Sequence, residues 1–259
     1  MRLNKFVSLN EGRSKKVSED FVRDFLERRG NEAVKGTLMY RGIDDYEDDY
    51  LYINPSEFDA RISPYAHNNF YNLLLSNLPS WKNYPKRNKS IICTTDMDNA
   101  KGRGDGDAYI VIPRNGAKIG VCSKEDIWIS FEFVDSLNDI NWSLEDFFEN
   151  TIFKEEGYYT PDDLDRNYNE FVKACKFADT IKNKYEFPSF YDWLKPYFLN
   201  KDMKLLDFLN KTLDPKRNGF KLKKTGDDLF SRRETWTNSD CVLIKRWSPI
   251  SEEFLLNYG

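Results

Sequence analysis

Apolar residues recur with a helical period in two places within the first third of the chain. Ser18 is a candidate N-cap, and the residues after it place an apolar face on a helix that Gly30 would end. That face consists of Phe21, Val22, Phe25 and Leu26. A second helix is predicted over 66–78, where an apolar face recurs at i, i+3, i+4 and i+7. The residues of this second face are Tyr71, Leu74, Leu75 and Leu78.

Short apolar runs rich in β-branched and aromatic residues predict strands on both sides of a helical region. The predicted strands span 37–42, 90–95, 108–113, 117–121, 219–226 and 234–247. The turn signal at 114–116 lies between two of these strands, which is typical of a hairpin.

Between about 140 and 213 the apolar spacing becomes helical, and one stripe there is especially regular. It is formed by Leu205, Phe208, Leu209 and Leu213. The order β-rich, helical, β-rich favours one discontinuous α+β domain over 18–259, with a helical insertion at about 140–213. Residues 1–17 are polar and mixed in charge, and we interpret them as a flexible arm.

Composition excludes several classes of function for this 259-residue chain. Its 39 Lys and Arg against 43 Asp and Glu give a net charge of −4, so no overall positive charge is present to coat a nucleic acid. No apolar run approaches the roughly 18 residues of a membrane span, and no membrane partner is expected. Residues 1–10 lack the apolar core of a signal peptide, so we expect a cytoplasmic protein.

The inventory of nucleophiles and metal ligands is equally restrictive. His67 is the single histidine, and we interpret it as a residue at a helix start or on the surface. The four cysteines contain no CxxC pair, which predicts reduced thiols and no zinc site. We therefore expect chemistry that uses no metal.

Three short motifs carry the candidate chemistry, and each stands at the end of a strand or just before one. They are Tyr40-Arg41-Gly42, Cys93-Thr94-Thr95 and Arg232-Arg233-Glu234. An arginine, a pair of hydroxyls and an acid in this order resemble the Arg-Ser-Glu group of ADP-ribosyltransferases over about 37–121 and 219–246. CTT stands where that family usually has Ser-Thr-Ser, and RRE stands where many members have Glu-x-Glu or Gln-x-Glu.

This resemblance implies a split, mixed β-sheet core and the transfer of ADP-ribose from NAD to a macromolecule with release of nicotinamide. Glu234 would stabilise the oxocarbenium-like transition state, as carboxylates do in glycoside hydrolysis. Thr94 or Thr95 would hold that acid in one rotamer. Arg41, with Tyr40 and Gly42 beside it, would bind the pyrophosphate or a ribose through its planar guanidinium.

Other residues compete for these roles. Glu125 and Asp126 in SKEDIW also precede a predicted apolar strand and are the main rivals for the acid, whereas Asp105 and Asp107 are weaker candidates. A secondary dinucleotide contact is predicted at the start of the second helix, where backbone N–H groups favour anions. Its residues are Arg61, Ser63, Asn68 and Asn69.

Two alternative functions remain open at this point. A catalytically silent binding or virion-associated protein would keep the fold without the activity. A nucleic-acid-binding module would use the basic runs KLKKTG and PKRNK. The expected acceptor of a transferase is a macromolecule, a protein in the first instance, with nucleic acid left open. The chain also resembles phage-encoded proteins, which implies a host interaction in the host cytoplasm.

Overall fold

The computed structural model describes residues 14–43, 48–57, 69–102, 107–134, 137–155, 164–182 and 192–258. The chain divides into two compact units. The sheet unit combines Met1–Arg61, Asn83–Asp126 and Phe220–Gly259, and the helical unit combines Ile62–Lys82 and Ile127–Gly219. The α+β class predicted from the sequence is therefore confirmed, whereas the grouping of both units into one domain stays a prediction.

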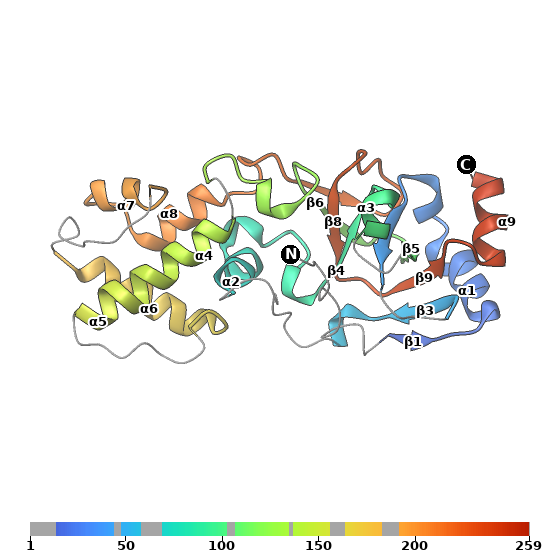
Figure 1. Ribbon diagram of the computed structural model, residues 1–259, viewed down its shortest axis with the longest axis horizontal. Coiled ribbons are helices and arrows are strands. Elements are labelled where there is room, and N and C mark those ends of the chain that lie inside the picture. The colour runs from blue at the N-terminus through green and yellow to red at the C-terminus, as the bar shows by residue number, and fades with distance from the viewer. Residues whose placement is uncertain are drawn as a thin grey trace. The chain divides into compact units, whose positions relative to one another are not determined.

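All strands of the described residues belong to one nine-stranded sheet in the sheet unit (Figure 1). Its spatial order is β1 (Lys15–Lys16), β3 (Tyr50–Ile53), β9 (Cys241–Lys245), β5 (Ala108–Pro113), β2 (Met39–Gly42), β4 (Ile91–Thr94), β8 (Glu234–Thr237), β6 (Lys118–Val121) and β7 (Lys221–Lys224). The resemblance implies a mixed sheet, but every ladder here is antiparallel. Strand direction depends on how distant segments return to one another, and the residue pattern does not encode this.

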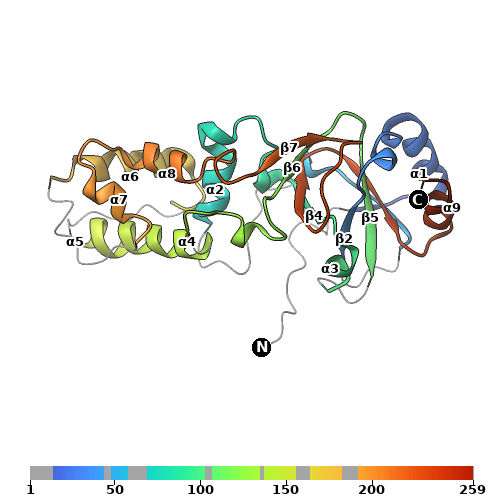
Figure 2. The ribbon, with the colours of Figure 1, turned by 90° about the horizontal axis from the view of Figure 1, so that it is seen from above.

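The predicted hairpin at 108–121 is wrong, because β5 and β6 do not pair with each other. β5 lies between β9 and β2, whereas β6 lies between β8 and β7. Figure 2 shows β6 beside β7 and apart from β5. Asn115 in the connecting turn bonds to the segment after the first helix instead: its Oδ1 accepts from the Glu32 N–H at 2.9 Å. The predicted strand 234–247 likewise divides into β8 and β9, which lie apart in the sheet.

Because β5 is separated from β6, and β8 from β9, the sheet consists of a β1-β3-β9-β5-β2 half and a β4-β8-β6-β7 half. The two halves meet at β2 and β4, whose ladder consists of the single residue pair Tyr40 and Thr94. By contrast, β4 and β8 pair along four residues. The junction between the halves is therefore also the place where two of the three motif strands meet.

One face of the sheet packs against α1 (Glu19–Phe25), beside which lies α9 (Pro249–Tyr258) (Figures 1 and 2). The predicted cap is confirmed, since Ser18 Oγ accepts a hydrogen bond from the Phe21 N–H at 3.3 Å. Val22 and Phe25 are buried as predicted. Phe21, predicted for the same face, is 42% exposed and meets the ring of Tyr52 edge-on.

The helical unit is built around a cluster of aromatic rings. Its helices are α2 (Phe70–Asn77), α4 (Leu137–Glu145), α5 (Phe153–Glu155), α6 (Tyr168–Thr180), α7 (Lys195–Leu199) and α8 (Leu205–Thr212). α2 packs against α4 and α6, and α6 packs against α8. The apolar stripe predicted over 205–213 is buried. α2 lies within the predicted 66–78 segment. It is buried on almost every side and not only on the predicted apolar face, because other elements surround it.

Candidate active site

The three motifs lie on three adjacent strands. β4, which carries Thr94, has β2 on one side and β8 on the other, so β2, β4 and β8 are consecutive in the sheet. These segments are far apart in the sequence, and their side-by-side arrangement is what the resemblance requires. The resemblance implies that the strand ends at 37–42, 90–95 and 234–244 lie side by side, and that Arg41, Thr94 or Thr95, and Glu234 face one pocket. The adjacency of the three motif strands is present. The common face is not, because Arg41 leaves the other side of the sheet from Glu234.

The ladder register decides which motif side chains share a face. Tyr40 pairs with Thr94, and Thr94 pairs with Glu234. Residues that are directly opposite each other in a ladder point to the same face of the sheet. Tyr40, Thr94 and Glu234 therefore form a row across three strands on one face.

Arg41 does not belong to that row. It follows Tyr40 in the strand, so its side chain leaves the opposite face, on the side of Cys93. Its Nη1 donates a hydrogen bond of 2.6 Å to the Ile92 carbonyl. The structure thus brings Thr94 and Glu234 together but places Arg41 across the sheet from them, because adjacent residues of a strand alternate between faces.

Glu234 is held in a buried ion pair. Its Oε1 lies 2.7 Å from Nη2 of Arg87, and the side chains of Arg87 and Glu234 are 6% and 3% exposed. The same oxygen accepts a long hydrogen bond from the Cys122 Sγ at 3.9 Å. A carboxylate this deeply buried requires a compensating charge, which Arg87 supplies.

Arg87 is the important residue that the sequence analysis did not single out. It begins a 3₁₀ helix at Arg87–Lys89, just before β4. Its guanidinium lies over the Trp236 ring at 5.5 Å from the ring centroid, and the Trp236 Nε1 donates to the Pro85 carbonyl at 2.9 Å. In the sequence it appears inside the run PKRNK, whose charges suggest a solvated surface, and no local signal distinguishes it.

The hydroxyl of Thr95 and the carboxylate of Asp96 secure the start of β8. The Arg233 N–H donates to Thr95 Oγ1 at 2.9 Å, and the Thr95 N–H donates to the Arg233 carbonyl at 2.9 Å. Asp96 accepts from backbone N–H groups of α3 (Met97–Gly102) and pairs with the Arg232 Nε at 3.1 Å. Thr95 therefore positions the segment that leads into Glu234.

The Cys93 side chain is buried on the same face of the sheet as Arg41. Burial raises the pKa of its thiol to about 12, the Arg41 guanidinium partly offsets this rise, and Glu234 adds to it. Burial also raises the pKa of Tyr40, against a smaller lowering by Arg246. Both groups are therefore neutral near pH 7, and Cys93 is not a thiolate nucleophile there.

The remaining predicted residues lie elsewhere or outside the described part. Gly42 ends β2 opposite Ala108. Glu125 is exposed and Asp126 half-buried in the segment after β6. The strand predicted directly after them is wrong, because Ile127–Ile129 forms a 3₁₀ helix. Asp107 pairs with Lys245 at 2.7 Å. Arg61, Ser63, Asn68, His67 and Asp105 lie outside the described residues, whereas Asn69 is buried directly before α2.

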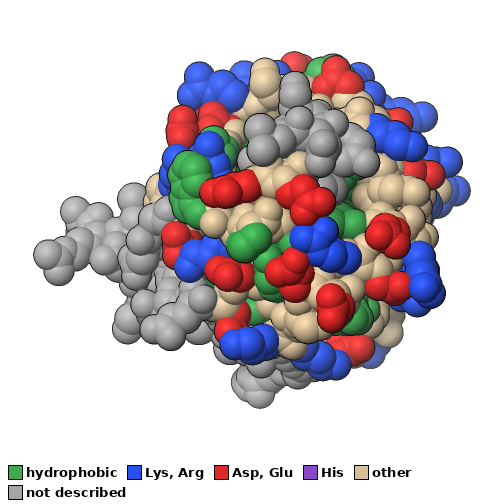
Figure 3. Space-filling model, turned by 90° about the vertical axis from the view of Figure 1, so that its right-hand side faces the viewer, with side chains coloured by type: hydrophobic (Ala, Val, Ile, Leu, Met, Phe, Trp, Pro, Cys, Tyr) green, Lys and Arg blue, Asp and Glu red, His purple; other side chains and the backbone are tan. Residues whose placement is uncertain are grey.

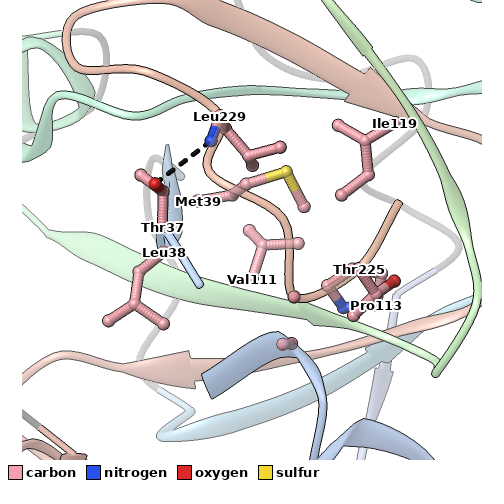
Figure 4. A pocket seen from close by; sticks show the side chains of 10 residues that line it. Thr37, Leu38, Met39, Val111, Pro113, Ile119, Thr225 and Leu229 are labelled. Carbon is pink, nitrogen blue, oxygen red and sulfur yellow. Dashed lines mark hydrogen bonds between the residues drawn. The ribbon is translucent and has the colours of Figure 1, made fainter. Parts of the chain in front are cut away.

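A small pocket lies where β5 and β6 diverge (Figure 4). Its lining is mostly apolar and includes Met39, Val111, Ile119 and Leu229, and the Leu229 N–H donates to Thr37 Oγ1 at 3.1 Å. Its enclosed space is about the size of one water molecule. It is therefore too small for a dinucleotide, and none of the predicted site residues lines it.

Three further findings concern the described part of the chain. Its residues contain no group of three His, Cys, Asp or Glu side chains able to hold a metal ion. None of its helices is long and apolar enough to cross a membrane. Cys93, Cys122, Cys175 and Cys241 are all described, and each is buried and forms no disulfide with a described residue. The expected absence of a metal stays a prediction.

The comparisons with known proteins do not extend this picture. No family model matches the chain, and neither the curated proteins nor the solved structures contain a significant match to it.

Proposed function

We propose that the chain transfers ADP-ribose from NAD to a macromolecular acceptor, within a fold of the ADP-ribosyltransferase type. The observation that supports this proposal most is the consecutive order of β2, β4 and β8. Each of these strands carries one of the three motifs on which the resemblance rests. The row formed by Tyr40, Thr94 and Glu234 then provides the hydroxyl beside the acid that such chemistry uses.

In this reaction the bond between C1′ of the ribose and the nicotinamide nitrogen breaks, and its electron pair leaves with nicotinamide. The Glu234 carboxylate stabilises the positive charge that develops on the sugar. A nucleophilic oxygen or nitrogen of the acceptor bonds to C1′ and releases its proton to the carboxylate or to solvent. The resemblance assigns the phosphate or ribose oxygens to Arg41. Because the Arg41 side chain leaves the face opposite to Glu234, a dinucleotide that contacts both residues must pass around the sheet beside β2.

A specific observation favours a second candidate, a catalytically silent binding protein that keeps this fold. Arg87 already occupies one oxygen of Glu234 at 2.7 Å, and the carboxylate is 3% exposed. An acid that serves only the stability of the sheet would be buried and paired in this way. Activity measurements separate the two candidates.

The deciding experiment measures nicotinamide release from NAD and transfer of labelled ADP-ribose to a cell lysate. Glu234→Gln keeps the size of the side chain and removes its charge, so it should slow turnover by on the order of a hundredfold or more. The KM for NAD should change little, because the charge acts mainly in the transition state. Arg41→Ala should instead raise the KM, because its contact exists in the ground state too.

Asp126→Asn is the matched control, since it removes the charge of the rival acid. It should leave turnover unchanged, and a rate lost in Asp126→Asn but kept in Glu234→Gln would move the acid to Asp126. Wild-type turnover no faster than in buffer would refute the transferase proposal and favour the silent protein. Because Glu234→Gln also breaks a buried ion pair, all variants are compared at a temperature at which each is shown to be folded.

A further inference from the structure

Strand β7, at one end of the sheet order, carries three lysines. Lys221, Lys223 and Lys224 extend from this four-residue strand, and none of them forms an ion pair with a described residue. Lys221 and Lys223 point to the same face, because they are two residues apart in a strand. Their separation along the strand is about 6.8 Å, so they present a regular pair of cations to an extended ligand.

The turn after β7 holds two large residues in a strained backbone conformation. Phe230 has φ 64° and Arg232 has φ 54°, both in the left-handed region that favours glycine. Such strain persists only where the surrounding structure enforces it, and it concentrates at binding and active sites. Here it directs an aromatic ring outward: Phe230 is 41% exposed.

Hydrogen bonds fix the position of this turn. Asp228 Oδ1 accepts from the Phe230 N–H at 2.8 Å and from Thr37 Oγ1 at 3.1 Å. Two residues later Arg232 pairs with Asp96, and the Arg233 N–H bonds to Thr95. The ring of Phe230 is therefore presented by a turn that is tied to neighbouring segments on both of its sides.

One cation lies beside the exposed ring, and others stand near it in the sequence. The Lys223 Nζ lies 5.1 Å from the centroid of Phe230. Residues 221–233 carry five cations and two carboxylates, and both carboxylates accept backbone N–H groups of this segment, Asp227 from Lys224 and Asp228 from Phe230. The face that carries α1 and α9 differs, because acids and bases are interspersed there (Figure 3).

We propose that β7 and the turn after it bind single-stranded nucleic acid, with Lys221, Lys223 and Arg233 contacting phosphates and Phe230 stacking on a base. Cations along an extended backbone beside an aromatic ring are the elements with which proteins hold single strands. A duplex fits less well, because its bases already stack on one another and expose no face to Phe230. An acidic peptide would satisfy the lysines but would leave the aromatic ring without a partner. The site does not depend on the proposed transferase activity.

The test measures fluorescence anisotropy of a labelled single strand of about 12 nucleotides, as DNA and as RNA, without NAD. Phe230→Ala should weaken binding by about 5- to 150-fold, which corresponds to the loss of one stacked base. Lys221→Gln with Lys223→Gln should reduce the slope of log K against log salt by about 1.4, since two phosphate contacts are lost. Phe230→Trp should retain binding, because it keeps the stacking surface.

The matched control is Lys15→Gln with Lys16→Gln, which removes two lysines from β1 at the other end of the sheet order. It should leave the affinity and the salt slope of the single strand unchanged. Each variant is checked for wild-type circular dichroism and melting before its binding is measured. The proposal is overturned if the protein binds a duplex of the same sequence, or polyglutamate, as tightly as the single strand. It is also overturned if Phe230→Ala leaves the affinity unchanged.

Discussion

Replacing Glu234 by Gln is expected to destabilise the sheet unit strongly, because the change leaves Arg87 charged and buried. The two side chains are 6% and 3% exposed and lie 2.7 Å apart, so water cannot take the place of the lost partner. Breaking a buried ion pair from one side costs about 3–5 kcal/mol. For a chain of this length each kcal/mol lowers the melting midpoint by about 2–4 °C, so we expect a fall of roughly 6–20 °C.

A double variant tests whether this cost comes from the unpaired charge. Arg87→Met combined with Glu234→Leu removes both charges and keeps most of the apolar volume. Apolar replacement of a complete buried pair is often neutral or stabilising. The double variant should therefore melt well above the two single variants Arg87→Met and Glu234→Leu. The measurement is thermal unfolding followed by circular dichroism, with the single changes and the pair at equal protein concentration.

Asp24→Asn is the matched control, because it breaks an ion pair that is exposed rather than buried. Asp24 lies 2.7 Å from Arg28, the same distance as in the buried pair, but these side chains are 54% and 75% exposed. Exposed pairs contribute at most about 1 kcal/mol, so the midpoint should fall by less than about 4 °C. The reasoning is refuted if Glu234→Gln costs no more than Asp24→Asn, or if the single changes simply add in the double variant.

Two further predictions concern close packing and the buried thiol. Gly120→Ala should cost about 1–3 kcal/mol, because its Cβ would lie 2.2 Å from Trp236 Cε2, whereas Gly102→Ala, with open space around the new Cβ, should be neutral or stabilising in thermal unfolding. Burial raises the pKa of Cys93 from 9.0 to about 12, so an unfolded chain releases this proton first. The contribution of Cys93 to stability is therefore complete below about pH 9 and falls by about 1.4 kcal/mol per pH unit as the pH rises towards 12. Urea unfolding of wild type and Cys93→Ala against pH checks this, and parallel curves above pH 9 would contradict it.

Local features of the sequence determined most of the individual elements. Ser18 starts its helix as predicted because a hydroxyl before an amphipathic segment caps the first free N–H groups wherever it occurs. The runs 90–95 and 108–113 form β4 and β5 because β-branched residues favour extended backbone. These outcomes depend on neighbours within a few residues, which a single sequence displays directly.

The pairing of those elements was decided by the tertiary structure. The turn at 114–116 has the composition of a hairpin, yet Asn115 bonds to Glu32 and β6 leaves to pair with β7 and β8. A strand pattern has a period of two and states which residues alternate, but it does not state which distant strand lies beside it. The adjacency of β2, β4 and β8 was predicted only through the resemblance of their motifs.

The candidate site shows the same division. The sequence by itself determined that an arginine, two threonines and an acid stand near strand ends. Only the register between β2, β4 and β8 placed Thr94 and Glu234 on one face and Arg41 on the other, since a shift of one residue would exchange the faces. Only the packing of Arg87 against Trp236 decided that Glu234 is buried in an ion pair, because burial is set by side chains that are distant in sequence.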